Sequence, residues 1–168
     1  GPLVSSEYFI EESPYRPTNP YSASKAGADH LVRAYYYTYG LDIVITNCAN
    51  NYGPRQFPEK LIPMVISNAL VGKNIAIHGD GHQVRDWVYV QDHCEVIDLV
   101  FHKGKSGQSY NIGGYNEVEI IDVARRICKI MDDVLEGSSR EALITFVKDR
   151  PGGDRHYAID PSFITKEL

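Results

Sequence analysis

Residues 20–48 read PYSASKAGADHLVRAYYYTYGLDIVITNC and join a helical pattern to a strand pattern. Apolar residues recur at helical spacing between Ala28 and Tyr35, and Gly40 is of the type that commonly ends a helix. The β-branched run DIVITNC that follows is typical of a buried strand. A helix that leads into a buried strand predicts the α/β class.

The rest of the chain continues this alternation. We expect a second helix over PEKLIPMVISNALVG, opened by Pro58, and a third over DHCEVIDLVFHKG, capped by Asp92. The stretch NIAIHGDGHQVRDWVYV is interpreted as a β-hairpin that turns at Asp80-Gly81. Short strands are expected in QSYNIGG, ITFV and HYAID. The clearest amphipathic helix is VEIIDVARRICKIMDDVL, with a predicted apolar face of Ile120, Val123, Ile127, Ile130 and Met131.

Composition argues against several classes of function. The net charge of −5 gives no basic footprint for nucleic acid, and no apolar run is long enough to cross a membrane. The six histidines form no HExxH and no cluster with cysteine, so no metal site is expected. Cys48, Cys94 and Cys128 are far apart and form no CxxC, which predicts reduced core thiols of a cytoplasmic protein.

Tyr21 and Lys25 are the first candidates for chemistry. They are four residues apart, so a helix places them on one face, one turn from each other. An ammonium near a phenol lowers the phenol pKa, and such a phenol can accept a proton from a hydroxyl. Because the chain has 12 tyrosines, a YxxxK pair also arises by chance on a surface helix. The pair alone therefore leaves both interpretations open.

Polar residues with a possible binding role follow the strands. Asn50 and Asn51 come where a strand ends, the usual place for ligand contacts in an open α/β sheet, although asparagine also suits the turn before Tyr52. Lys60 is predicted in the first turn of a helix, where the helix dipole disfavours a cation. A pyrophosphate partner would account for it, and a solvated surface lysine is the alternative.

Two arginines extend this set. Arg85 in QVRDW is suited to a diphosphate because a guanidinium engages two oxygens at once, but it could instead pair with Asp86 or Asp92. Arg150 lies in DRPGGDR, a Gly/Pro-rich loop of the kind that closes over a ligand. Trp87 is expected in the core.

Taken together, the motifs resemble the extended short-chain dehydrogenase/reductase family, and more narrowly the nucleotide-sugar 4,6-dehydratases. The resemblance covers nearly all of residues 12–168. It rests on NPYSASKAGADHLVRAYYYTYGL, NCANNYGPRQFPEKLIP, GDGHQVRDWVYVQDH, YNIGGYNE and DRPGGDRHYAID, in this order. It implies that residues 1–53 are the C-terminal part of a Rossmann-type domain with the YxxxK helix. Residues 54–168 would be mainly a small sugar-nucleotide-binding lobe, interleaved with late Rossmann elements.

The resemblance also implies a reaction, the conversion of dTDP-glucose to dTDP-4-keto-6-deoxyglucose through transient reduction of bound NAD. Tyr21 would take the proton of the sugar 4-hydroxyl, and Lys25 would hold the nicotinamide ribose and lower the Tyr21 pKa. Asn51 would lie near the cofactor. The substrate contacts that it implies are Asn50, Lys60, Leu61, Ala76, Ile77, His78, Arg85 and Arg150. Two positions depart from the family pattern, since Gly153 replaces the usual histidine and Ile120 the usual asparagine.

Some parts of that machinery are missing from the sequence. It contains no GxGxxG or GxxGxxG loop and no Thr-Asp-Glu motif, which in this family carries the acid and base of the elimination. We therefore expect a C-terminal fragment that is inactive alone and forms a homodimer through the YxxxK helix when intact. The alternatives are a UDP-sugar 4,6-dehydratase, a nucleotide-sugar epimerase, and a non-catalytic sugar-nucleotide-binding module.

Overall fold

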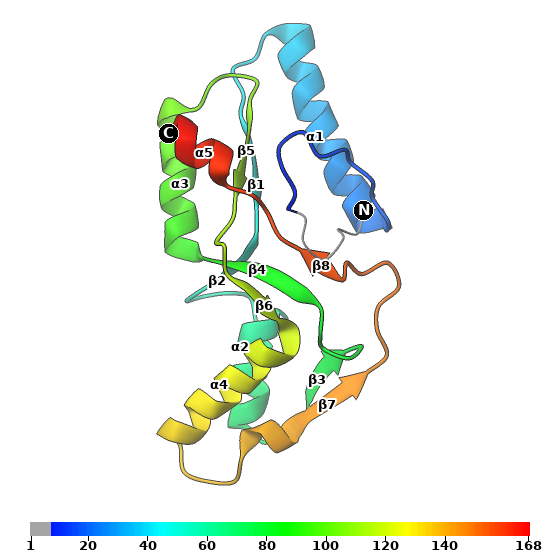
Figure 1. Cartoon of the computed structure of the whole chain (residues 1–168), viewed down its shortest axis with the longest axis vertical. Helices are drawn as coiled ribbons and strands as arrows, with labels where there is room; N and C mark the ends of the chain where they lie inside the picture. The colour runs from blue at the N-terminus through cyan, green and yellow to red at the C-terminus, as the bar shows by residue number, and fades with distance from the viewer. Residues whose placement is uncertain (1–7) are drawn as a thin grey trace.

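The strands of the computed structural model, which describes residues 8–168, form three hydrogen-bonded groups (Figure 1). The strands are β1 (Ile45–Cys48), β2 (Asn50–Tyr52), β3 (Ile75–His78), β4 (Val84–Tyr89), β5 (Ser109–Ile112), β6 (Glu117–Glu119), β7 (Ile144–Val147) and β8 (His156–Tyr157). The helices are α1 (Pro20–Tyr39), α2 (Leu61–Leu70), α3 (Val90–Lys103), α4 (Ile120–Val134), the 3-10 helix η1 (Arg140–Leu143) and α5 (Ser162–Glu167). The predicted α/β class is confirmed.

Most strand pairs are parallel and join distant parts of the sequence. β1 pairs with β5, β2 with β4, and β3 with β7, all in parallel. β4 is the most connected strand, since it also pairs with β6 in antiparallel fashion and with β8 in parallel. Parallel strands need long crossover connections, so each pair draws together segments that are remote in the chain.

The predicted hairpin over residues 74–90 is wrong, although its turn exists. Gly79 and Gly81 both have positive φ, at 64° and 78°, as a tight reversal requires. The strands on either side of the turn do not pair with each other, because β3 binds β7 and β4 binds β2, β6 and β8. The turn therefore connects two different sheets.

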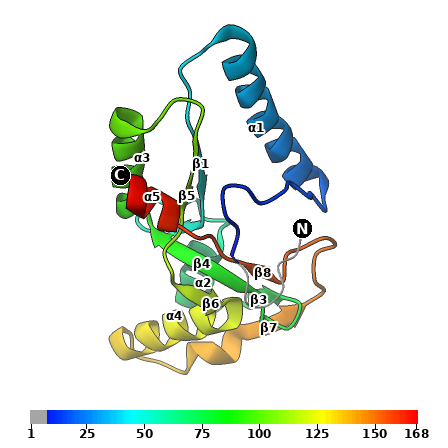
Figure 2. The same cartoon turned by 45° about the horizontal axis from the view of Figure 1, so that its top comes forward.

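One hydrophobic cluster lies between β1, β5, α3 and α5. Its buried members are Val100, Tyr110, Ile112 and Ile164. Figures 1 and 2 show α3 and α5 on one side of β1 and β5, with α1 on the other. On α1 the only buried residue is Ala26, whereas Leu31 and Tyr35 are 64% and 51% exposed. The predicted helix is thus confirmed, but in this chain its apolar stripe has no cover among the described residues.

A second cluster lies among α2, β3, α4 and β7, which together are called the lower lobe (Figure 1). In it α2 and α4 pack against each other, and α2 contacts β3. Val65, Ile75 and Cys128 are fully buried in it. Burying an aliphatic side chain of this size stabilises a fold by roughly 1.5–3 kcal/mol. Of the predicted apolar face of α4, Met131 is buried and Ile120 and Ile127 pack against the cluster, but Ile121, Ala124 and Cys128 are buried as well. Ile130 is exposed, and its assignment to the core face was wrong.

The ends of the helices agree only in part with the start and stop residues predicted from the sequence. Gly40 ends α1 in a left-handed conformation, and its N–H donates to the carbonyl of Tyr36, as expected. α2 begins at Leu61, not at Pro58, and α3 begins at Val90 with Tyr89 at its N-cap. Asp92 therefore lies in the first turn of α3, where a carboxylate suits the helix dipole, but it does not cap the helix.

The three cysteines are all free, but they do not share one environment. Cys128 is buried and Cys48 is half-buried, as core thiols should be. Cys94 is exposed, so its assignment to the core was wrong. Within residues 8–168, no helix combines the length and apolarity that a bilayer crossing demands.

Candidate functional site

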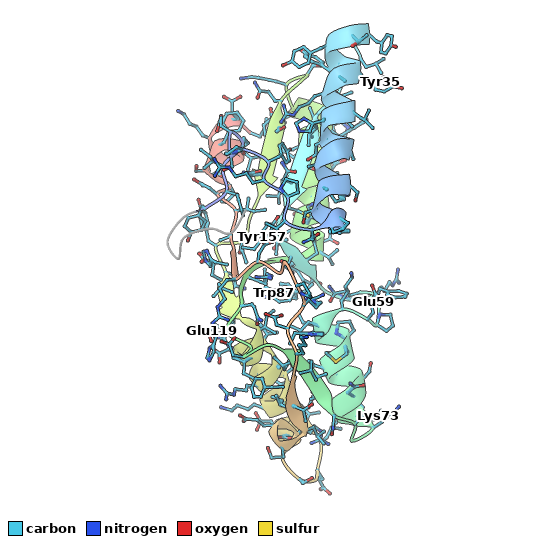
Figure 3. All side chains as sticks on the ribbon, turned by 90° about the vertical axis from the view of Figure 1, so that its right-hand side faces the viewer. Tyr35, Glu59, Lys73, Trp87, Glu119 and Tyr157 are labelled. Atoms are coloured by element: carbon cyan, nitrogen blue, oxygen red, sulfur yellow. The ribbon has the colours of Figure 1, made fainter. Side chains whose placement is uncertain are left out.

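A cavity of about 500 Å³ lies where the lower lobe meets β2 and β4. Its walls come from the ends of β2 and β3, the start of α2, β4 and the loop between β7 and β8. Figure 3 shows Trp87 of β4 near the middle of the molecule, and Glu59 in the segment that leads into α2. The cavity is large enough for a ligand of nucleotide size.

All of the predicted substrate contacts line this one cavity, together with Asn51. They are Asn50, Lys60, Leu61, Ala76, Ile77, His78, Arg85 and Arg150. They come from five separate segments of sequence, so their meeting depends on the fold. The two positions that depart from the family pattern, Ile120 and Gly153, line the same cavity.

Arg85 has an unusual electrostatic setting. Its two terminal nitrogens each donate a 2.7 Å hydrogen bond to a backbone oxygen, one of Val84 and one of Asp154. Burial lowers the pKa of this guanidinium from its ordinary value, and no carboxylate within residues 8–168 forms an ion pair with it. The pairing with Asp86 or Asp92 is therefore ruled out. A half-buried cation held only by carbonyls remains able to bind an anion in the cavity.

The other cations of the cavity are more exposed. Lys60 occupies the N-cap position just before α2, one residue outside the predicted first turn, and its ammonium lies 3.4 Å from the carboxylate of Glu59. Arg150 lies in the loop between β7 and β8. Beside it, the carboxylate of Asp149 accepts from the side chain of Gln83 and from the backbone N–H of Arg150. The cavity thus contains three cations, Arg85, Lys60 and Arg150, beside the carboxylates of Glu59, Asp149 and Asp154.

Several lining residues escaped the sequence-based prediction. The polar ones are Gln56, Glu59, Gln83, Asp149 and Asp154. The alternation of strand residues was a usable signal, because Gln83, Arg85 and Trp87 are two apart and line the same cavity. Trp87 is buried, as predicted, yet it also forms part of the cavity wall.

Tyr21 and Lys25 lie outside this cavity, near the start of α1. Tyr21 is 73% exposed, and within residues 8–168 neither side chain has a hydrogen bond or ion pair to another side chain. A smaller cavity of about 210 Å³ lies beside them, lined by Ser22 and Ala26 of the same helix. Asp154 lines both cavities and so lies between the two groups of candidates.

Asn51 links the cavity to the end of β1. Its amide nitrogen donates to the sulfur of Cys48 at 3.4 Å. Burial raises the pKa of the Cys48 thiol, while the hydrogen bond from Asn51 and the charge of Lys25 act in the opposite direction. The amide of Asn51 and the charge of Lys25 thus both act on the Cys48 thiol.

The amide of Asn51 is held in place by His93 of α3. The His93 Nδ1 lies 2.7 Å from the Asn51 side-chain oxygen, and burial lowers the His93 pKa. A neutral imidazole that carries its proton on Nδ1 donates to that oxygen, which leaves the amide N–H groups of Asn51 as donors. His93 was not among the predicted site residues. Within residues 8–168, no group of three or more acidic, histidine or cysteine side chains could hold a metal ion.

Comparison with known proteins gives a consistent picture. The family model described as GDP-mannose 4,6 dehydratase matches residues 3–168. A dTDP-glucose 4,6-dehydratase of Xanthomonas campestris pv. campestris (strain B100) is 53% identical over 171 residues, which cover 100% of this chain and 49% of that relative. The chain thus spans about half the length of the curated relatives it matches.

Solved structures share the fold. The crystal structure of dTDP-glucose 4,6-dehydratase from Bacillus anthracis in complex with NAD matches with a TM-score of 0.89 and 46% identity, over 99% of this chain and 51% of that one. UDP-glucuronic acid 4-epimerase from Bacillus cereus, in complex with UDP-glucuronic acid and NAD, matches with a TM-score of 0.87 and 28% identity. This match covers 100% of this chain and 51% of that one. The Rossmann-like α/β architecture is therefore shared with enzymes of known structure.

Proposed function

Because this chain belongs to the GDP-mannose 4,6 dehydratase family, we propose that the full-length product of its gene dehydrates dTDP-glucose to dTDP-4-keto-6-deoxyglucose with bound NAD. The relative from Xanthomonas campestris, 53% identical, bears the name of that activity. The carrying observation is the half-buried guanidinium of Arg85, which forms no ion pair with a carboxylate of residues 8–168, in a cavity lined by every predicted substrate contact.

Different residues of the cavity are proposed to contact different parts of the nucleotide sugar. Arg85, Lys60 and Arg150 would neutralise the diphosphate, with Arg85 as the fixed anchor because two carbonyls hold its fork. Leu61, Ala76, Ile77 and His78 would flank the thymine and its sugar. Asn50 would contact the hexose, at the edge of the cavity nearer β1.

Tyr21 is the proposed base. Its phenolate would accept the proton of the sugar 4-hydroxyl, and the ammonium of Lys25, one helical turn away, would stabilise that phenolate. NAD, when bound, supplies the reversible oxidation of the sugar carbon that makes the neighbouring proton acidic. Lys25 and the amide of Asn51 would hold the cofactor at the end of β1.

This chain alone is proposed to be inactive, since its sequence has neither a glycine-rich phosphate loop nor a Thr-Asp-Glu motif. In the full-length protein, the exposed stripe of α1 that includes Leu31, Val32 and Tyr35 is proposed to pack against a second copy. A homodimer would bury this stripe, which is unusually apolar for a solvated surface. We also propose a cytoplasmic location, because none of the three cysteines forms a disulfide.

Epimerisation of a UDP-sugar is the second candidate, favoured by the structural match to UDP-glucuronic acid 4-epimerase. A sugar-nucleotide-binding module without catalysis remains as the third. All three use the same cavity and differ in what happens to the ligand.

One experiment separates them. The full-length gene product is incubated with NAD and either dTDP-glucose or UDP-glucose, and the nucleotide sugar is followed by mass spectrometry. Loss of one water from dTDP-glucose is the expected result. Loss of water from UDP-glucose alone would reassign the nucleotide. An unchanged mass with both substrates, in folded protein, would overturn the dehydratase, and chromatographic separation of isomers would then distinguish an epimerase from a binding module.

A further inference from the structure

The loop over residues 148–155, between β7 and β8, contacts both the lower lobe and the start of α1. At one end, Arg155 forms a bidentate ion pair with Asp80 in the turn after β3, in which its two terminal nitrogens lie 2.8 and 2.9 Å from the two carboxylate oxygens. At the other, Gln83 donates to Asp149 at 3.2 Å. These contacts tie both ends of the loop to the lower lobe, and the middle of the loop extends toward the start of α1 (Figures 1 and 2).

The contact with α1 is made by a single backbone oxygen. The carbonyl of Gly152 accepts from the side-chain nitrogen of Asn19 at 3.1 Å and from the hydroxyl of Thr18 at 3.2 Å. Gly152 has φ of +71°, a conformation that disfavours a side chain, and an added Cβ would approach the Thr18 carbonyl to 3.1 Å. The glycine thus allows the close approach of the loop to the helix.

Asn19 is also the N-cap of α1. Its side-chain oxygen accepts a 2.8 Å hydrogen bond from the N–H of Ser22 and so satisfies a free donor of the first turn. The same amide therefore makes two different contacts, because its oxygen holds the helix and its nitrogen holds the loop. The helix carries Tyr21 and Lys25, while the loop carries Arg150.

We infer that Asn19 is a positioning residue, which sets the arginine loop relative to the catalytic helix through the two ends of one side-chain amide. The inference rests on the proposed function, since it takes Arg150 as a ligand of the diphosphate. It assigns Asn19 no contact with the substrate. Its effect is to order the loop before the ligand arrives, which reduces the entropy lost on binding.

Substitution at this position can separate the two contacts. Asn19→Ser keeps an oxygen that caps the helix about as well as asparagine does, adds no charge, and is too short to reach Gly152. Thr18→Val removes the other donor, so the double variant leaves the Gly152 oxygen without a side-chain donor. Asn19→Ala loses the cap as well. Thr165→Val is the matched control, since that hydroxyl also donates to a carbonyl at the start of a helix, that of Pro161, the N-cap residue of α5.

Affinity is the first measurement, made by calorimetry with dTDP on the full-length gene product and its variants. A neutral hydrogen bond contributes about 0.5–1.5 kcal/mol, so the Kd for dTDP should rise about 2- to 10-fold in Asn19→Ser and further in the double variant. The KM for dTDP-glucose should rise in parallel while kcat stays within about twofold, because the cap that holds Tyr21 is kept. Asn19→Ala should lower Tm as well, and Thr165→Val should match the wild type in Kd.

Loop order is the second measurement and needs no ligand. Trypsin can cut the loop after Lys148 and after Arg155, whereas the bond after Arg150 precedes a proline and resists it. Cleavage at these two sites, followed by mass spectrometry, should be several-fold faster in Asn19→Ser and in the double variant than in the wild type or Thr165→Val.

The two measurements decide the inference separately from the function. Wild-type Kd and wild-type cleavage in the double variant would overturn it. Faster cleavage with an unchanged Kd would also overturn it, because the loop would then be held by Asn19 without serving the ligand. If the wild-type protein binds no dTDP, the proposed function fails, and unchanged cleavage would show in addition that Asn19 does not order the loop.

Discussion

The side chain of Arg85 donates a 2.7 Å hydrogen bond to the backbone oxygen of Asp154, 69 residues further along the chain. This bond joins β4 to the loop that precedes β8, and a second bond to Val84 fixes the plane of the guanidinium. The charge is thereby positioned at the cavity before any ligand binds.

Replacement of Arg85 tests that arrangement. Arg85→Ala should raise the Kd for dTDP about 10- to 100-fold, the range that corresponds to the loss of one charge-assisted hydrogen bond of about 1.5–3 kcal/mol. Arg85→Lys should retain part of the affinity, because an ammonium keeps the charge but not the fork. Calorimetry on the full-length protein measures both. Arg125→Ala, which removes an exposed ion pair with Glu141, is the control, and equal Kd values for all variants would contradict the anchor role.

Replacement of Tyr21 by phenylalanine should remove the proton acceptor and little else. We expect kcat to fall by at least about 100-fold, the usual scale for a general base, while the Kd for dTDP stays within about twofold. Tyr37→Phe serves as the control, since this tyrosine lies on the same helix and is 80% exposed. A Tyr21→Phe enzyme with near wild-type turnover would remove Tyr21 from the mechanism.

The buried carboxylate of Asp86 should matter for stability. It is fully buried and accepts hydrogen bonds from the backbone N–H groups of Gly114 and Asn116, both at 2.9 Å. Asp86→Ala leaves both donors without a partner, which should cost about 2–4 kcal/mol. Urea unfolding of the full-length protein measures the loss, with the exposed Asp133→Ala as the control. Two equal unfolding curves would show that water replaces the carboxylate.

Tyr157 should make the fold sensitive to alkali. Its burial, and to a lesser degree the nearby Cys48, raise its pKa from 10.0 to about 12. Because the folded pKa lies above the unfolded one, the stabilisation is fully present below pH 10 and is lost as the pH rises toward 12. The slope that this one group adds is at most about 1.4 kcal/mol per pH unit.

Tyr157→Phe should remove that slope. Thermal unfolding between pH 8 and pH 11.5 would then show a wild-type Tm that falls more steeply than the variant's above pH 10. The exposed Tyr37→Phe should follow the wild type. Parallel curves for wild type and Tyr157→Phe would mean that the phenol ionises as freely in the folded chain as in the unfolded one.

The local parts of the fold could be predicted from sequence. Gly40 ended the helix as expected, since a left-handed stop depends on one residue type. The pairing of the strand before the turn at Gly81 could not be predicted. That strand, β3, pairs with β7 about 70 residues later, and no local signal specifies that partner. Asp92 failed as a cap because Val90 already follows β4 into the helix without an intervening loop.

The candidate site shows the same division. The resemblance supplied the cavity residues one by one, but it could not supply their neighbours. His93 was missed because its contact with Asn51 spans 42 positions and only folding brings the two together. Asn19 is a recognisable N-cap from its place before Pro20 and Tyr21, yet its second bond to Gly152 depends on a loop 133 residues away.

The core of the lower lobe is built from two stretches of chain, residues 61–78 and 120–147, and between them the chain leaves the lobe to form α3 and β5. This arrangement limits recombination between related genes. A chimera with a single crossover between the two stretches would combine half of the lobe from each parent, and the two halves of its core would not match. An engineer who wishes to change nucleotide preference must therefore transplant both stretches together, with junctions in the turn after β3 and in β6.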